Sequence, residues 1–534
     1  MVGLIDQNRL GARVRVGQDV GTIKYIGIVE GHEGTWIGVE WDDPSRGRHN
    51  GTVNGHYYFE TKYPKSGSLI RSEKIEKFET LENAIRERYL PPEQQSYIND
   101  QLLNETRDAL SAPFMKVIGM EKIRERQSKL KFIEELTISN STINEAGKLP
   151  ELDSLRSICL QSSCIATWKV VHDIASQIPS LRNIDLSYNR LLMINQVEPL
   201  KFETLDTLIL NSCQLSNWDD VLNIARMIPN LREFALKQNN IKHITDKSSE
   251  VFQKLEVLIL AENEICDFNE ILKLSSVPSL RELLINNNEI KNVKLPHCDY
   301  TAKLTIFKNL ESLNLRHNPI ENELEMFNEL DKLPTLNRLS YVNKKISNTP
   351  TTTNDTCEND NTEIFMQAIG MIENLTSFNR SCIEKIHRND ATYEMWKKFA
   401  PEWMKVGGEG DPKMEEFYQS HRCYPRLLKK YGNPDQFILQ PQRKRVTTIE
   451  VQFKNVLNGN MYRKKVPLAM NVRSLVGLVY KIAALHTCPG MDLKSIKLYY
   501  IDAYNNNIKV YLDNSSKSLD YYSLQNGDTI YIEK

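Results

Sequence analysis

The 534-residue sequence predicts a multidomain protein: a small β domain, an α/β repeat array, a helical segment and a C-terminal mixed β domain. Three observations predict this order. Glycine, β-branched and aromatic residues crowd residues 21–71, leucines recur at a fixed period from residue 133, and apolar residues alternate after residue 446. At roughly 100–200 residues per domain, the length suits three or four domains.

Composition excludes several classes of protein. A formal net charge of −1 gives no overall field that would attract nucleic acid or a membrane surface. No apolar run approaches the roughly eighteen residues that cross a bilayer, and the first residues lack the apolar core of a signal peptide. The nine cysteines are scattered without a Cys-x-x-Cys pair, as expected of free thiols. We therefore expect a cytoplasmic protein with no nucleic-acid or membrane partner.

The sequence carries no recognisable catalytic motif. It has no Walker A loop, Gly-x-Ser-x-Gly elbow, Gly-x-Gly-x-x-Gly turn or cluster of metal ligands. We expect no catalytic residue, no cofactor and no metal, and so not an enzyme. Binding that differs between two states of a client is enough to shift the equilibrium between those states.

The first domain is expected over residues 1–78, and its most informative stretch is GRHNGTVNGHYYFET at residues 47–61. A glycine-rich polar loop stands directly against three aromatic residues. On the residues alone, the stretch is either a turn leading into a strand or a binding surface.

Residues 21–71 resemble the CAP-Gly family. The family's Gly-Lys-Asn-Asp-Gly loop is matched by Gly-Arg-His-Asn-Gly at residues 47–51, and Val53, Gly55, Trp36, Gly38 and the Ile70-Arg71 ending also match. The resemblance implies a groove that binds the acidic C-terminal Glu-Glu-Tyr/Phe tail of α-tubulin. The tail-binding residues that it implies are Trp36, Gly47, Arg48, His49, Asn50, Gly51, Tyr58, Phe59 and Arg71.

Each of these residue types suits an acidic tail. Glycines let the backbone N–H groups of the loop approach carboxylates. Arg48 and Arg71 supply positive charge, and an arginine can bind a carboxylate with two parallel hydrogen bonds. His49 is expected to donate more strongly below about pH 6.5, its ordinary pKa. Residues 79–128, charged and partly helical, are expected to form a semi-rigid spacer.

Residues 129–346 predict leucine-rich repeats. The template L-x-x-L-x-L-x-x-N/C-x-L fits six times, as in LRNIDLSYNRL at 181–191 and LDTLILNSCQL at 205–215, with two weaker copies that start at Ile133 and Leu155 and a degenerate one at Leu336. Each repeat has one short strand whose leucines point inward, and stacked neighbours form a continuous core. The Asn or Cys is expected to bond backbone groups where the chain leaves the strand. Helical spacing in 167–181 and 217–231 predicts that these crossings are helices.

The alternation of strand side chains predicts what the concave face exposes. Ile209, Val257, Ile259 and Leu284 are expected to form an apolar cluster over three adjacent repeats, within a frame of charges. Such a patch marks a client-binding site. The alternative is that a neighbouring domain of the same chain covers it.

Two further regions follow the repeats. Residues 347–363 are polar and predict a loop, and residues 364–440 predict a helical region whose Trp396 and Trp403 pack inside it. Residues 446–534 then predict the order strand, strand, helix, strand, strand, strand. Asn471 is expected to cap the helix, whose buried face carries Leu475, Val479 and Ile482. This order resembles the β-grasp fold of the ubiquitin-like family.

The order of CAP-Gly, leucine-rich-repeat and ubiquitin-like domains resembles the tubulin-folding cofactor E family, also called tubulin-specific chaperone E, along essentially the whole chain. The resemblance implies a chaperone of α-tubulin, associated with the cytoskeleton, that takes part in assembly and dissociation of the αβ-tubulin heterodimer. It also implies tubulin-folding cofactors B, C and D as partners. The alternative function is an adaptor whose ubiquitin-like domain delivers bound tubulin to the proteasome or other ubiquitin-pathway factors.

Overall fold

The computed structural model forms two compact units, Met1–Asn433 and Pro434–Lys534. It describes residues 9–89, 130–192, 200–343, 354–406, 412–434, 448–455, 461–486, 496–502, 508–513, 517–522, 524 and 528–533.

The chain begins with a four-stranded antiparallel sheet in the order β1-β2-β3-β6. The strands are β1 (Arg13–Val16), β2 (Asp19–Val29), β3 (His32–Trp41) and β6 (Gly67–Ile70). Val14, Ile23 and Trp41 bury their side chains in its small core. Between β3 and β6, the short strands β4 (Thr52–Val53) and β5 (His56–Tyr57) form a hairpin, followed after β6 by the 3₁₀ turn η2 (Ser72–Lys74). This is the predicted small β domain.

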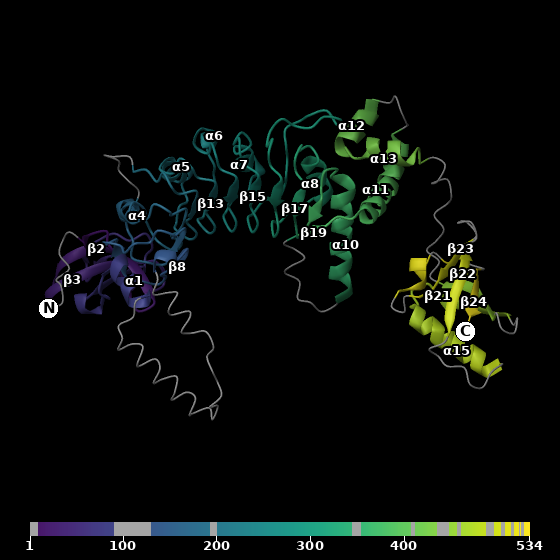
Figure 1. Cartoon of the computed structure of the whole chain (residues 1–534), viewed down its shortest axis with the longest axis horizontal. Helices are drawn as coiled ribbons and strands as arrows, with labels where there is room; N and C mark the ends of the chain where they lie inside the picture. Colours follow the sequence, from purple (N-terminus) through teal and green to yellow (C-terminus); the bar gives the residue numbers. More distant parts are fainter. Residues whose placement is uncertain are drawn as a thin grey trace. The chain divides into compact units, whose positions relative to one another are not determined.

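Each of the nine predicted repeats contains one three-residue strand, and neighbouring strands pair in parallel. The strands are β8 (Glu135–Thr137), β10 (Ser157–Cys159), β11 (Asn183–Asp185), β12 (Thr207–Ile209), β13 (Glu233–Ala235), β14 (Val257–Ile259), β15 (Glu282–Leu284), β16 (Ser312–Asn314) and β17 (Arg338–Ser340). They stand side by side along the array (Figure 1). The leucine-rich-repeat prediction is therefore confirmed.

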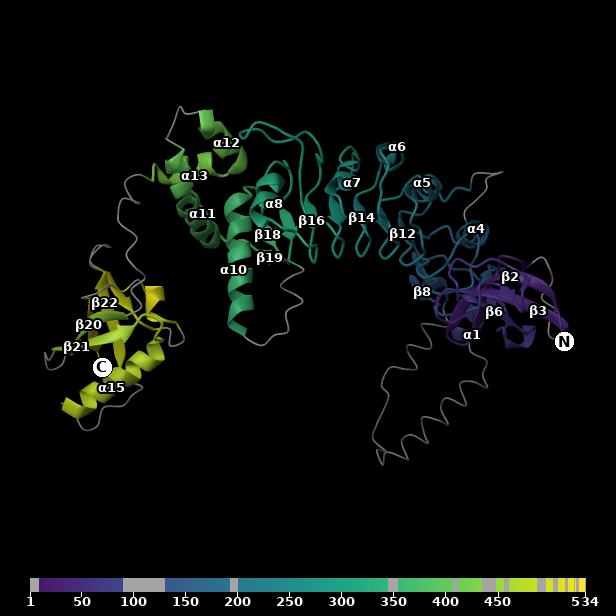
Figure 2. The same ribbon diagram turned by 180° about the vertical axis from the view of Figure 1, so that it is seen from behind.

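Helices run along the side of the array opposite the strands' exposed face (Figure 2). They are α4 (Trp168–Ala175), α5 (Trp218–Arg226), α6 (Ser248–Val251), α7 (Phe268–Leu272) and α8 (Glu323–Leu330). The crossings at 167–181 and 217–231 are helical as predicted. Local capping fixes where helices begin: the Asn217 side chain accepts a hydrogen bond from the Asp219 N–H at 3.1 Å.

In the six repeats that carry Asn or Cys at this position, the side chain bonds backbone groups of its own and neighbouring repeats, as predicted. Asn263 is 5% exposed, and its Oδ1 accepts the N–H groups of Asn239 (2.9 Å) and Ile241 (3.1 Å). Its Nδ2 donates to the carbonyls of Leu236 (2.9 Å) and Leu260 (3.1 Å). The same arrangement recurs through an asparagine ladder, which we define as Asn189, Asn239, Asn263, Asn288 and Asn318.

The expected spacer at residues 79–128 is wrong in its first part. Strand β7 (Glu79–Thr80) pairs in parallel with β9 (Ile143–Glu145), beside the first repeat. Helix α1 (Leu81–Tyr89) buries Leu81, Ala84 and Ile85 in the core that it shares with the repeats. Residues 79–89, together with the 3₁₀ turn η3 (Leu130–Phe132), therefore close the N-terminal end of the array. The rest of the expected spacer, residues 90–128, lies outside the described residues.

The small β domain is also in direct contact with the repeat array. The Asp42 carboxylate accepts hydrogen bonds from Arg13 (2.7 Å) within the domain and forms an ion pair with Arg190 (3.0 Å) of the array. Arg15 donates to the hydroxyl of Ser162 at 3.0 Å. Burial of Arg190 at this contact lowers its pKa, although Asp42 acts in the opposite direction. Polar contacts thus hold the domain against the second and third repeats.

We expect Asp42→Asn to weaken this contact, because Arg13 and Arg190 would lose the anion between them. Arg13 is 1% exposed, so the unpaired charge cannot recover its hydration. A loss of about 2 kcal/mol in stability of the contact is expected. Faster amide hydrogen exchange in β1 and around Arg190 measures the effect.

The matched control is Asp43→Asn. Asp43 is the next residue and carries the same charge, but its carboxylate bonds only Ser45 among the described residues. Equal exchange rates in the two variants would contradict the role given to Asp42.

The helices after the repeats close the other end of the array. They are α10 (Asn354–Met371), α11 (Lys385–Lys405), α12 (Pro412–Ser420) and α13 (Tyr424–Tyr431), with strands β18 (Ser377–Phe378) and β19 (Ser381–Cys382) extending the sheet from β17. Trp396 and Trp403 are buried, as predicted, in one core with the repeats. The expected loop at 347–363 is wrong from Asn354, where α10 begins, and residues 347–353 lie outside the described residues.

The second unit has the predicted ubiquitin-like fold. Its sheet has the order β21-β20-β24-β22-β23. The strands are β20 (Thr448–Asn455), β21 (Met461–Pro467), β22 (Lys497–Asp502), β23 (Ile508–Tyr511) and β24 (Thr529–Glu533), with the 3₁₀ turn η5 (Leu519–Tyr522) before the last. Asn471 caps α15 (Val472–His486) by accepting the Ser474 N–H at 2.8 Å. Leu475 and Val479 are buried under the sheet, whereas the Ile482 side chain and residues 446–447 lie outside the description.

Candidate functional site: a cationic groove and an apolar row

A groove of 380 Å³ opens in the small β domain beside the Gly-Arg-His-Asn-Gly loop. It is lined by Val16, Val29, His32, Trp36, Arg46, Arg48, His49, Val53, Ser68, Leu69, Ile70 and Lys74. The end of β2, the start of β3 and the end of β6 form its walls, and the loop after β3 forms its rim. Of the residues implied by the resemblance, Trp36, Arg48 and His49 line the groove.

Trp36 and Arg71 form the aromatic side of this groove. The Arg71 guanidinium carbon lies 4.0 Å from the centre of the Trp36 ring, within the range of a cation–π interaction. The His32 ring approaches the same indole at 5.4 Å between centroids. Buried Nε1 of Trp36 has no hydrogen-bond partner in the described residues. A ligand acceptor would satisfy this indole N–H, which otherwise costs free energy.

The cations around the groove are poorly neutralised. Within the part of the chain that the structure describes, neither Arg48 nor Arg71 forms an ion pair with Asp or Glu. Lys74 also lines the groove and forms no ion pair within the described residues, whereas Arg46, the other cation of the lining, is paired with Asp19. His32, Arg46 and Lys74 were not among the residues expected from the sequence. The sequence pointed to them only weakly: Lys74 is a basic residue shortly after the matched Ile70-Arg71 ending, His32 is the first residue of β3, and Arg46 follows that strand.

The glycines of the loop serve its packing, which corrects the expectation that they expose backbone donors. Gly51 has φ +92°, and a Cβ there would lie 1.7 Å from the Phe59 carbonyl oxygen. The Arg48 and His49 N–H groups donate to the Gly67 carbonyl at 2.7 and 3.1 Å. The loop donors at residues 48, 49 and 51 are thus used inside the domain, and side chains must supply the contacts to an anion.

His49 is a neutral acceptor in this structure. Its Nδ1 accepts the Gly51 N–H at 3.0 Å, and burial lowers its pKa below the ordinary value. Protonation would break the bond to Gly51. The expected gain in donor strength just below pH 6.5 is therefore wrong, because the ring takes up its proton only at a lower pH.

The remaining residues of the expected set support the loop from behind. Phe59 is 4% exposed and its ring packs against the His49 ring at 5.9 Å. The Tyr58 hydroxyl accepts the Glu30 N–H at 3.1 Å, and the Asn50 side chain accepts the Thr52 N–H at 3.1 Å. These three residues shape the loop and do not line the groove.

The repeat array carries a second candidate site on the exposed face of its strands. Parallel register places Ile209, Ala235, Ile259 and Leu284 opposite one another on β12, β13, β14 and β15. We call these four residues the apolar row. Ile209, Ile259 and Leu284 are half-buried, and none of the four belongs to the core beneath the strands.

This register corrects the predicted cluster in two respects. The cluster spans four strands and not three adjacent repeats, because Ala235 fills the position on β13. Val257 lies outside the apolar row, since its partners across the strands are Glu233 and Glu282. A β-strand exposes alternate residues to the same face, so Val257 belongs to the next row of the same surface.

Some of the charges around the apolar row are paired with each other, whereas Glu233 and Glu282, beside Val257, form no ion pair within the described residues. Arg281 bonds Glu311 at 3.3 Å, and Lys237 bonds Glu262 at 2.8 Å. Arg232 and Glu256 form a further ion pair across two repeats. Exposed pairs of this kind add little stability. The apolar row is the part of this face whose contact with water a bound partner would remove.

In the part of the chain that the structure describes, no three His, Cys, Asp or Glu side chains gather in a way that could hold a metal ion. Nor is any helix of the described chain both long and apolar enough to cross a membrane.

Known proteins resemble this chain in parts and over its whole length. The CAP-Gly domain family matches residues 10–75. The chain is 39% identical to tubulin-specific chaperone E of Drosophila melanogaster, with 100% of each chain covered, and 29% identical to that of Bos taurus, with 98% of each covered. The solved C-terminal ubiquitin-like domain of mouse tubulin-specific chaperone E covers 17% of this chain and 90% of its own, at 18% identity and a TM-score of 0.15.

Proposed function

The chain belongs to the tubulin-specific chaperone E family, and we propose from this premise that it is a tubulin-folding chaperone. In this proposal the groove binds the C-terminal tail of α-tubulin and the apolar row binds its folded body. The protein then takes part in assembly and dissociation of the αβ-tubulin heterodimer in the cytoplasm, together with cofactors B, C and D. It acts by binding, since a ligand shifts an equilibrium by its different affinity for the two states.

The unpaired cations beside Trp36 are the observation that carries the tail-binding part. Arg48 and Arg71 match the charge of a glutamate-rich tail, and charge-assisted hydrogen bonds are stronger than neutral ones. The free indole N–H of Trp36 adds a donor in a half-buried position. A terminal aromatic ring has a partly apolar surface to pack on, formed by Val29, Val53 and Trp36.

The apolar row supports the second part of the proposal. A tail is flexible and polar, so it has little apolar surface to bury against the four strands that carry the apolar row. The folded body of a client does have matching surface, and apolar burial is the main source of affinity between folded proteins. One client would thus meet the protein at two places.

Mixing the purified full-length protein with soluble tubulin tests the function directly. We expect the β-subunit to separate from the dimer while α-tubulin stays bound, with the proteasome absent. Size-exclusion chromatography followed by subunit analysis measures this. Tubulin that remains dimeric and elutes apart from the protein would contradict the proposal, whereas loss of tubulin only when proteasomes are added would favour a degradation adaptor.

We expect Arg48→Ala and Arg71→Ala each to weaken binding of a peptide ending in Glu-Glu-Tyr. A hydrogen bond to a charged group is worth roughly 1.5–3 kcal/mol, or about tenfold or more in affinity. Arg71 should have the larger effect, because its guanidinium is held over the Trp36 ring and loses less freedom on binding. Titration of the labelled peptide into the full-length variants gives the dissociation constants.

Lys65→Ala is the matched control. Lys65 is an exposed cation of the same domain and does not line the groove. If all three variants bind the peptide as the unchanged protein does, the groove is not the tail site.

A further inference from the structure

The ubiquitin-like unit has an exposed sheet face with an unusual side-chain pattern. Strand residues such as Ile449, Val451, Leu498 and Ile530 point toward α15 and form the core. The residues between them point to the opposite face of the sheet. In register across β20, β24, β22 and β23, that face presents Lys454, Tyr531, Tyr499 and Tyr511. We call the three tyrosines the tyrosine row.

The rings of the tyrosine row pack on one another. Tyr499 and Tyr531 stack at 5.0 Å between centroids with an angle of 9°, and Tyr511 meets Tyr499 at 5.5 Å. Lysine ammonium groups lie over two of the rings, with Lys509 4.3 Å from the centroid of the central ring, Tyr499, and Lys454 5.9 Å from that of Tyr531. Tyr499 is only 6% exposed although it lies outside the core, because its neighbours on this face cover it.

Further cations surround this row. Lys497 precedes Tyr499 on the same face of β22, and Arg463 and Lys465 lie on the same face of β21. All three are exposed, and none forms an ion pair with another described residue. The face also carries Glu450 and Glu533, of which Glu533 accepts a hydrogen bond from the Tyr511 hydroxyl at 3.2 Å.

The whole unit shares this positive charge. Residues 434–534 contain 14 Lys or Arg and 8 Asp or Glu, so their formal charge is +6. The net charge of the chain is −1, which leaves −7 on residues 1–433. The near-neutral total thus conceals a basic C-terminal unit, and a basic surface raises the association rate of an acidic partner.

We propose that this face binds an extended, glutamate-rich peptide segment of a partner protein. The lysine ammonium groups and the hydroxyls of Tyr499 and Tyr531 are hydrogen-bond donors that suit the carboxylates of such a segment, whereas the Tyr511 hydroxyl already donates to Glu533. The apolar sides of the rings pack against its backbone and methylene groups. The surface is separate from the groove of the first unit and extends the proposed function to a second acidic ligand.

Ring geometry favours a peptide over a nucleic acid. Proteins bind single-stranded nucleic acid by stacking bases on free aromatic faces. Here the rings of Tyr499 and Tyr531 stack on each other under Lys509 and Lys454, which leaves the ring of Tyr511, 42% exposed, as the accessible aromatic surface of the row. Five strands at about 4.8 Å spacing give a face about 19 Å wide. That width accommodates roughly six extended residues.

A blocked peptide separates this surface from the groove. The probe is a fluorescent glutamate-rich peptide of about eight residues with an amidated C-terminus, which lacks the terminal carboxylate and aromatic ring of a tail. It is titrated into the full-length protein carrying Arg48→Ala and Arg71→Ala. The test variant adds Lys454→Gln, Lys497→Gln and Lys509→Gln. We expect it to bind roughly tenfold more weakly, since several ion pairs are lost together.

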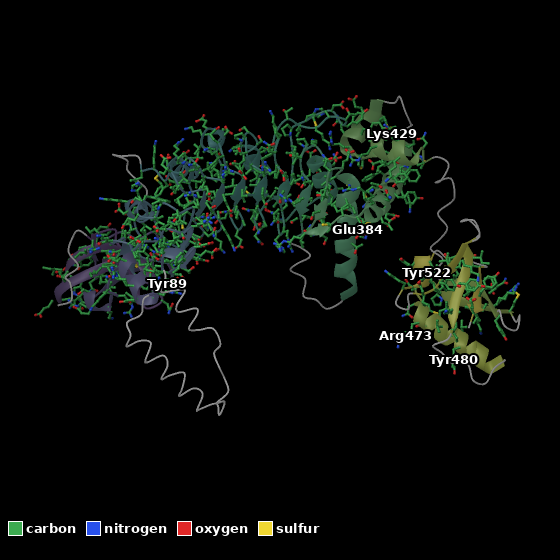
Figure 3. All side chains as sticks on the ribbon, viewed as in Figure 1. Tyr89, Glu384, Lys429, Arg473, Tyr480 and Tyr522 are labelled. Atoms are coloured by element: carbon green, nitrogen blue, oxygen red, sulfur yellow. The ribbon has the colours of Figure 1, made fainter. Side chains whose placement is uncertain are left out.

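The control variant removes three cations of the same unit that lie off this face: Arg473→Gln, Lys481→Gln and Lys517→Gln. Arg473, labelled in Figure 3, is exposed on α15, and Lys481 is an exposed residue of the same helix. Both variants have the same net charge, so only position distinguishes them. We expect the control to bind the probe within about twofold of the background protein, allowing for the long-range charge effect alone.

Three outcomes would overturn the proposal. Equal weakening in both variants would mean that net charge alone attracts the peptide. Binding too weak to saturate in the background protein would mean that the face is no peptide site. Tighter binding of an oligonucleotide of the same charge, lost in the test variant, would assign the face to nucleic acid. None of these results depends on tubulin or on the terminal-tail peptide. Failure of this proposal can therefore be distinguished from failure of the proposed function.

Discussion

Replacing Ile259 and Leu284 together with glutamate is expected to abolish capture of the tubulin body. The two residues are neighbours in the apolar row, with partners paired directly across β14 and β15. Two buried carboxylates at the centre of an interface would lose their hydration without gaining a partner. Central contact residues of this kind cost 2 kcal/mol or more when removed, so we expect affinity to fall by roughly a hundredfold or more. Pull-down of tubulin by the full-length variant measures it.

The fold should survive this change, because the core leucines beneath the strands are not altered. The control is Phe132→Glu with Ile386→Glu, which introduces the same two charges at apolar residues exposed by 69% and 61% away from the apolar row. Binding of the Glu-Glu-Tyr peptide should be unchanged in both variants. A double variant that still separates tubulin dimers at the normal rate would show that the body binds elsewhere.

Asn263→Ala is expected to give the largest loss of stability in the repeat array. The side chain bonds the N–H groups of Asn239 and Ile241 and the carbonyls of Leu236 and Leu260, all in the buried interior. Alanine would remove the bonds to the Asn239 and Ile241 N–H groups and to the Leu236 carbonyl, at about 1–3 kcal/mol each, while the Leu260 carbonyl would keep its bond from Asn288. We expect a loss of about 4 kcal/mol or more, measured as faster hydrogen exchange of the Asn239 and Ile241 amides and as a lower thermal midpoint.

Asn286→Ala is the control for this experiment. Asn286 has the same side chain and lies two residues before Asn288, the ladder member of the next repeat, but its side chain makes no hydrogen bond within the described residues. Its replacement should stay within about 0.5 kcal/mol, as most surface substitutions do. Similar losses in both variants would mean that the asparagine ladder does not stabilise the array through its bonds.

Local pattern was enough to predict the repeats and the ubiquitin-like strands. A leucine such as Leu258 is buried because its own repeat and the two beside it supply the same pattern, so nearby sequence contains the information. The Asn471 cap is likewise decided within three residues of the chain. The CAP-Gly motif located the groove through Trp36 and Arg48, although its binding residues remain a prediction.

Contacts between distant segments were not predictable in this way. In Arg13-Val14-Arg15-Val16 the alternation predicts solvated arginines, yet Arg13 and Arg15 are 1% and 4% exposed. They are covered because the repeat array, about 150 residues later, supplies Ser162 and Arg190. Residues 79–89 resemble a spacer in the sequence because they are rich in charged residues. Their apolar residues Leu81 and Ile85 are nevertheless buried, because the core that covers them is supplied by the repeats. Likewise, the role of Ala235 depended on register, which no single repeat reveals.

The contact around Asp42 affects how a client protein could bind to the groove and to the apolar row. Polar contacts join the small β domain to the repeat array, so the groove and the apolar row belong to one compact unit, and the distance between them is limited. Under the proposed function, the tail of a client bound at the apolar row must therefore extend a limited distance to enter the groove. The protein would then select clients by the length of their tails. A client with a long enough tail binds at both the groove and the apolar row, and a client with a shorter tail binds at the apolar row alone.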